Sequence, residues 1–115
     1  MSHKNRSGMA ARRRTHALVF AALGDTTRLL LVTKLCSGQR YSISQLTQGS
    51  KLTRQAITKH LRVLKGAGVV CSVRSGRERL FEFQPERMEE LKKYLDFVSE
   101  QWDQALSRLK AFTER

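Results

Sequence analysis

The sequence has few cysteines and no long apolar run, and each shortage excludes a class of protein. Among its 115 residues only Cys36 and Cys71 carry thiols, too few for a disulfide framework. We interpret both as small, buried apolar residues in a reducing, cytoplasmic compartment. No apolar segment approaches the roughly 18 residues of a membrane helix, so we expect no membrane partner. The apolar run over residues 17–23 follows three arginines, but it is at the short limit for a signal peptide and we do not interpret it as one.

Acidic residues are also scarce, and the scarcity is confined to one part of the chain. Lysine and arginine total 22 against 10 aspartate and glutamate residues, a formal net charge of +12. Residues 1–85 hold 16 basic and 3 acidic side chains, a net of +13, whereas residues 86–115 hold 6 and 7, a net of −1. A basic body joined to a nearly neutral tail predicts a polyanionic partner.

The motifs of common enzyme classes are missing from the sequence. It has no glycine-rich phosphate loop, no H-E-x-x-H, no G-x-S-x-G and no cluster of acidic residues. We therefore expect a protein that is not an enzyme and that carries no cofactor.

Apolar spacing and capping residues predict four helical segments before residue 70. Residues 1–11, which are mostly small or polar, are expected to be a flexible basic arm. The helices are expected over residues 13–23, residues 26–36 with Asp25 as N-cap, a short segment from Ser42 to Gly49, and a segment that begins at Thr53 and stops at residues 66–68.

The apolar period then changes from helical to alternating. β-branched and aromatic residues on both sides of Ser75 and Gly76 predict a β-hairpin. Pro85 suits the first position of a last helix, over residues 85–115. The expected fold is therefore mainly α with a small β-hairpin, an α+β fold. Residues 12–84 would form its DNA-binding part, with the last helix in the same domain unit.

The short segment after Ser42 and the helix after Thr53 have the order and the glycine-containing turn of a helix-turn-helix, and the hairpin that follows adds a wing. The second helix is expected to turn four apolar residues inward, Ala56, Ile57, Leu61 and Leu64. Its outward side chains are of the types that bind base edges, and its N-terminus near Thr53 can meet a phosphate. These outward residues are Arg54, Gln55, Thr58, Lys59 and Arg62, with His60 at the margin.

Apolar residues recur along the last helix at alternating spacings of three and four. This heptad pattern predicts a seam for another helix, and a helix of this length exceeds what one small domain can cover. We expect a homodimer whose seam is shared with the first helix near Phe20; packing within the chain's own domain is the alternative. The heptad residues are Met88, Leu91, Leu95, Val98, Trp102, Ala105, Leu109 and Phe112.

Three segments in order resemble one known family. LTRQAITKHLRVLKGAGVV at residues 52–70 and RSGRERLFEF at residues 74–83 closely resemble the recognition helix and wing of ArsR/SmtB-type winged-helix repressors. VFAALGDTTRLLLVTKL at residues 19–35 resembles the family's first two helices, with Thr26 where proline is usual. The resemblance implies four helices, a hairpin and a fifth helix, a dimer through the first and last helices, and operator binding that blocks transcription.

The same resemblance implies which residues contact double-stranded DNA. Positions matching Arg54, Gln55, Thr58, Lys59 and His60 face DNA in the family, and the wing arginines follow the phosphate backbone. These wing residues are Arg74, Arg77 and Arg79. A protein of this kind would lie in the bacterial cytoplasm, associated with the nucleoid through DNA.

Metal sensing is not expected, although members of the family sense metals. Those members carry a Cys-x-Cys pair in the third helix, or Asp and His ligands on the last. Residues 41–50 contain no Cys, His, Asp or Glu, and the last helix has no His or Cys. Because soft metals need thiolate or imidazole, we expect no metal site, and a small-molecule effector stays open.

Two functions of other classes fit part of the pattern. A basic protein that associates with RNA or ribosomes would need the same charge but no operator. A protein–protein adaptor would act through the last helix alone.

Overall fold

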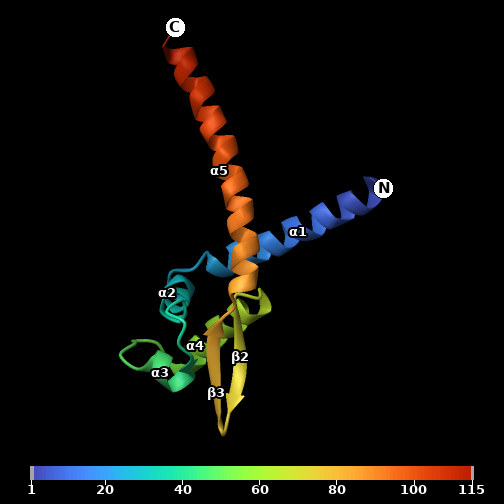
Figure 1. The fold of residues 1–115 in the computed structure, drawn as a ribbon. Coiled ribbons are helices and arrows are strands. Elements are labelled where there is room, and N and C mark those ends of the chain that lie inside the picture. Colours follow the sequence, from blue (N-terminus) through green and yellow to red (C-terminus); the bar gives the residue numbers. More distant parts are fainter. Residues whose placement is uncertain (1, 115) are drawn as a thin grey trace. The chain divides into compact units, whose positions relative to one another are not determined.

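The computed structural model describes the backbone of residues 2–114 and the side chains of residues 8–114. The chain divides into two compact units, residues 1–85 and residues 86–115. The first unit holds four helices and three strands, and the second is the continuous helix α5 (Figure 1). Among the described residues no helix has the length and apolar character that crossing a bilayer requires. The elements are α1 (Ser2–Leu23), α2 (Thr26–Leu35), β1 (Tyr41–Ser42), α3 (Ile43–Thr47), α4 (Arg54–Gly66), β2 (Val70–Ser75), β3 (Glu78–Phe83) and α5 (Pro85–Thr113).

The first helix starts earlier than the sequence predicted. Its backbone is helical from Ser2, where a flexible arm was expected over residues 1–11. Alanine and arginine have high helix propensity, so Ala10, Ala11 and Arg12 extend the helix toward the N-terminus although they contribute little apolar surface. The side chains of residues 1–7 lie outside the described part of the chain, as does the whole of residue 1.

All three predicted N-caps are confirmed. The carboxylate of Asp25 accepts a hydrogen bond from the backbone N–H of Arg28 at 3.0 Å, which starts α2. Ser42 and Gln45 form a reciprocal capping box at the start of α3. The hydroxyl of Thr53 accepts from the N–H of Ala56 at 3.1 Å and starts α4. These caps satisfy N–H groups that have no partner inside their own helices.

The cap at Thr53 gives a stability prediction. Replacing Thr53 by alanine should lower the free energy of unfolding by about 1 kcal/mol, because the first turn of α4 loses its side-chain acceptor. Urea denaturation of the purified protein measures the change. Thr53→Ser keeps the hydroxyl and should stay close to wild type; an equal loss in both variants would contradict the capping role.

The core of the first unit gathers around α4. Ile57, Leu61 and Leu64 are each at most 1% exposed, and α4 contacts α1, α2, α3 and β2. The inward face predicted for this helix is therefore confirmed. α3, the turn and α4 form the helix-turn-helix. The buried apolar residues around them are Val19, Ala22, Leu31, Val32, Leu35, Leu46, Ala67, Val69, Val70 and Phe81.

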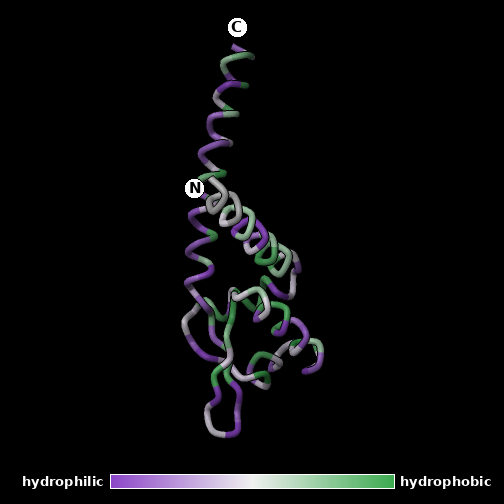
Figure 2. Tube along the Cα trace, turned by 90° about the vertical axis from the view of Figure 1, so that its right-hand side faces the viewer, coloured by the Kyte–Doolittle hydropathy of each residue, from purple (hydrophilic) through white to green (hydrophobic). Residues whose placement is uncertain are grey.

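The sheet has one strand more than the sequence predicted. β2 and β3 form the expected antiparallel hairpin, and the short β1 adds to the other edge of β3, with Tyr41 opposite Phe81. Two residues are too few for a strand pattern in sequence. At the hairpin turn Gly76 has φ of 63°, a left-handed conformation that favours glycine. The tip of this wing is hydrophilic, whereas its base is apolar (Figure 2). Helix-turn-helix and wing together make a winged helix-turn-helix fold.

The interpretation of both cysteines as buried residues is wrong for Cys36. Its side chain is exposed, because it follows the last residue of α2 and caps the helix through its backbone. Cys71 is half-buried in β2.

Candidate nucleic-acid interface

One face of α4 carries a row of exposed polar side chains. Arg54, Gln55, Lys59 and Arg62 are all exposed, and the last three lie on the side opposite the buried Ile57. The side chains of Gln55, Lys59 and Arg62 make no hydrogen bond or ion pair with any residue that the structure describes. Their donors and acceptors are therefore available to a ligand outside the chain.

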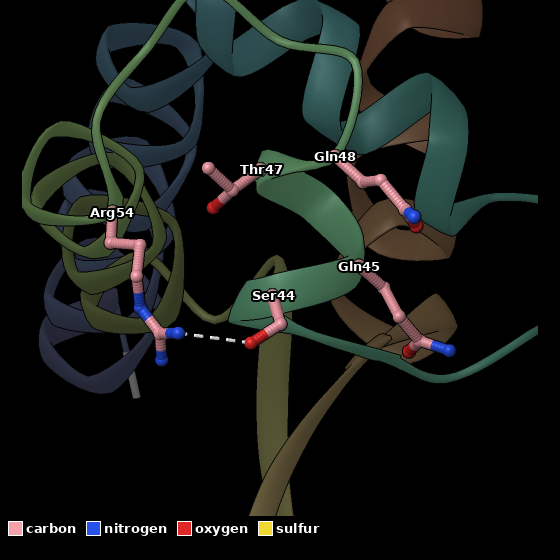
Figure 3. Close-up of a pocket in the computed structure, with 5 residues that line it drawn as sticks. All are labelled: Ser44, Gln45, Thr47, Gln48 and Arg54. Carbon is pink, nitrogen blue, oxygen red and sulfur yellow. Dashed lines mark hydrogen bonds between the residues drawn. The ribbon is translucent and has the colours of Figure 1, made fainter.

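Arg54 is held by the preceding helix. Its Nη1 donates to the hydroxyl of Ser44 on α3 at 3.0 Å, beside a surface pocket that Arg54, α3 and Gln48 line (Figure 3). An arginine fork has five donors, so this contact leaves others for a base or phosphate. Ser44 could not be identified from sequence alone, because its contact with Arg54 depends on how α3 packs against α4.

Two threonines of this face use their hydroxyls within the helix. Thr53 accepts from the N–H of Ala56, and Thr58, half-buried, donates to the carbonyl of Arg54 at 2.6 Å. Thr58 keeps its methyl group and Thr53 keeps its O–H donor for an external contact.

His60 is half-buried at the margin of the exposed face, as the sequence predicted. Its Nδ1 lies 3.3 Å from Nη1 of Arg28 and 3.8 Å from a carboxylate oxygen of Asp25. The backbone N–H of Arg28, above all, lowers the pKa of the Asp25 carboxyl, and the charge of the Arg28 guanidinium acts in the same direction. Asp25 is thus favoured as an anion beside His60. Sequence reasoning placed Asp25 only as a cap and assigned no role to Arg28.

The wing places two arginines directly opposite each other. Arg74 on β2 pairs in register with Arg79 on β3, and Arg77 lies in the turn between the strands. All three are exposed. Like charges opposite each other in an antiparallel pair are destabilising, and a polyanion between them would relieve the repulsion.

The other edge of the sheet holds an ion pair away from the wing tip. Nε of Arg40 donates to Glu82 at 2.8 Å, and this hydrogen bond is the main cause that lowers the pKa of Glu82. Burial raises the pKa of the Cys71 thiol, and the neighbouring carboxylate of Glu82 adds to the effect. Cys71 is therefore favoured as a neutral thiol, in keeping with a packing residue.

The apolar stripe of α5 is mostly exposed in the single chain. Trp102 is 69% exposed, and Leu95, Leu109 and Phe112 are also exposed. Leu91 differs from them: it is only 2% exposed in the single chain, so it has little surface to offer a partner, and its assignment to the interface stays a prediction. Phe20 of α1 is exposed, and Val98 is partly exposed.

Within the described residues no three His, Cys, Asp or Glu side chains gather in a way that could hold a metal ion. The expectation that the chain lacks a metal site stays a prediction.

The known proteins that are similar to this chain are described as transcriptional regulators. The model of the family described as bacterial regulatory protein, arsR family, matches residues 25–72. The uncharacterised HTH-type transcriptional regulator YuzN of Bacillus subtilis is 40% identical over 81 residues, which cover 65% of this chain and 88% of YuzN. The HTH-type transcriptional repressor SmtB of Mycobacterium tuberculosis is 37% identical over 60 residues, covering 52% of this chain and 44% of SmtB.

The fold is found in solved structures as well. The structure of an ArsR-like transcriptional regulator from Rhodococcus sp. RHA1 matches with a TM-score of 0.73 and 34% identity. The match covers 91% of this chain and 95% of the Rhodococcus chain, so it extends well beyond the residues that the family model matches.

Proposed function

This chain belongs to the arsR family of bacterial regulatory proteins, which are transcriptional regulators, and we propose that it is a repressor that binds a palindromic operator as a homodimer. The observation that carries the proposal is the exposed polar face of α4, whose Gln55, Lys59 and Arg62 have no partner among the described residues. A helix with such a face, preceded by a short helix, is the element that enters a major groove.

Within this proposal the first turn of α4 contacts base edges. Arg54 binds guanine through two donors, Gln55 binds adenine through its amide, and the methyl group of Thr58 packs on thymine. Lys59 and Arg62 contact phosphates on the flanks. The N–H groups and hydroxyl at Thr53 bind a phosphate at the helix N-terminus.

The wing contacts the DNA backbone. Arg74, Arg77 and Arg79 together place three cations at one hairpin end, with two of them directly opposite each other. Phosphate contacts fix the position of a protein on a duplex but carry no sequence information. We therefore assign these arginines to affinity and the first turn of α4 to specificity.

The dimer forms along the exposed stripe of α5 together with α1 in this proposal. Leu95, Trp102 and Leu109 are large apolar side chains left exposed in the single chain, and such stripes mark interaction sites. Val98 and Phe20 extend the surface. Two recognition helices on one dimer then lie about 34 Å apart, one turn of DNA, which requires an imperfect palindrome.

Repression follows if the bound dimer covers the region that transcription needs. The name of SmtB, which is related over part of the chain, supports repression over activation. An effector that releases the operator fits the proposal, and nothing in the described residues names its chemistry. The protein would act on the nucleoid in the bacterial cytoplasm.

Substitutions in the first turn of α4 test the specificity assignment. Arg54→Ala or Gln55→Ala should each weaken operator binding by about 1–3 kcal/mol and relax the preference at particular base pairs. Selection of bound duplexes from a random pool, with wild type and each variant, measures both effects. Arg77→Ala is the control, because it should weaken all sequences alike. Equal losses on operator and random DNA for Gln55→Ala would contradict base contact.

A further inference from the structure

Arg28 joins three elements of the first unit through one side chain. Its Nε donates to the carbonyl of Ala22 at 2.5 Å and its Nη2 to the carbonyl of Ala21 at 3.4 Å, both at the C-terminal end of α1. Its Nη1 lies 3.3 Å from Nδ1 of His60 on α4. Its own backbone N–H meets the Asp25 carboxylate at the start of α2.

We propose that Arg28 is a positioning residue for the recognition helix: through His60 it fixes α4 against the end of α1. The inference rests on the proposed function, in which α4 binds bases and α1 contributes to the dimer. A link between these helices sets how the base-contacting side chains of each subunit lie relative to the dimer. Arg28 itself is only partly exposed, and its side-chain donors bind acceptors within the protein.

The chemistry of this link requires arginine. A guanidinium has donors on three nitrogens in a fixed plane, so one group reaches two carbonyls of α1 and the imidazole of His60 together. A lysine in the same place keeps the charge, but its single nitrogen cannot satisfy all three directions. Arg28→Lys therefore removes the link and leaves the net charge unchanged.

The geometry also assigns a role to Nδ1 of His60 in this contact. Because a guanidinium only donates, Nδ1 is the acceptor in a hydrogen bond with Arg28. The Asp25 carboxylate lies 3.8 Å from the same nitrogen. Nδ1 of His60 is therefore bonded within the protein. In this proposal His60 affects DNA binding by holding α4 in place, and not through a contact between Nδ1 and DNA.

Arg28→Lys gives the first test, by titration of a selected operator duplex and a random duplex of equal length. The operator affinity should fall by about tenfold, because a hydrogen-bonded contact of a charged group that orients α4 is lost. The affinity for random DNA should stay within about twofold, since non-specific binding depends on the unchanged positive charge. Arg12→Lys, an exposed substitution on α1, is the matched control and should leave both affinities unchanged.

A pair of substitutions at His60 separates the link from direct reading of DNA. Asparagine offers an acceptor close to the position of Nδ1, whereas glutamine offers a polar group close to Nε2. We expect His60→Asn to keep most of the operator affinity and His60→Gln to lose it to the same extent as Arg28→Lys. In the double variant Arg28→Lys with His60→Gln the losses should not add, because both remove one contact.

The outcomes distinguish the proposed operator binding from the proposed link between Arg28 and His60. A wild-type protein that does not prefer any duplex to random DNA would contradict the proposed function. A wild-type preference that Arg28→Lys leaves unchanged, or a His60→Gln variant that binds the operator better than His60→Asn, would overturn the link alone. If Arg28→Lys unfolds, the His60 pair decides, since both of its members keep Arg28.

Discussion

Raising the salt concentration from 50 to 200 mM should weaken operator binding by about 10³ to 10⁵. Residues 1–85 carry a net charge of +13, and each proposed subunit presents wing arginines and exposed cations of α4 to the backbone. A dimer that neutralises about 6–10 phosphates releases their counterions, so log K falls with log salt at a slope near −0.9 per phosphate.

Fluorescence anisotropy at four or five salt concentrations measures this slope. Arg77→Ala should reduce its magnitude by about one for each subunit that loses a phosphate contact. Random duplexes should show a steep slope too, because phosphate contacts do not depend on sequence. A slope flatter than about −3 for the wild type would contradict the electrostatic interface.

Trp102→Ala should shift the protein from dimer to monomer and weaken operator binding without touching DNA. Trp102 is 69% exposed in the single chain and lies near the middle of the α5 stripe, where burial by a partner would be most complete. Truncating a central interface tryptophan costs about 2 kcal/mol or more, which raises the dimer dissociation constant about 30-fold. A monomer presents one recognition helix instead of two.

Analytical ultracentrifugation with parallel operator titrations tests both parts of this prediction. Phe97→Ala is the matched control: Phe97 is an exposed aromatic residue of the same helix, 58% exposed, outside the heptad stripe. It should change neither the dimer nor the operator affinity. A wild-type chain that is monomeric at tens of micromolar, on the order of ordinary dimer affinities, would contradict the seam.

Local signals in the sequence were enough to predict the helix-turn-helix and its wing. Asp25, Ser42 and Thr53 act as caps through hydrogen bonds that span three residues, so their chemistry is visible in a short window. The outward and inward faces of α4 follow from helical spacing alone. The hairpin turn follows from Gly76 between two alternating segments.

Features that depend on packing between elements could not be predicted. β1 exists because Tyr41 and Ser42 meet the free edge of β3, forty residues along the chain. Arg28 meets His60 across 32 residues, so neither side chain indicates the other in sequence. Leu91 fits the same heptad pattern as Trp102, yet only the structure separates the buried residue from the exposed one.

Hydroxyl-radical footprinting on a selected operator tests the central claim most directly, because it detects sequence-specific binding and the geometry of the dimer together. We predict two protected segments whose centres lie about 10 base pairs apart, related by the symmetry of an imperfect palindrome. Gln55→Ala should lose both protected segments at a protein concentration that is only just sufficient for the wild type to protect them. Uniform protection of any duplex, or protection of a single segment at saturation, would contradict a dimeric operator-binding repressor.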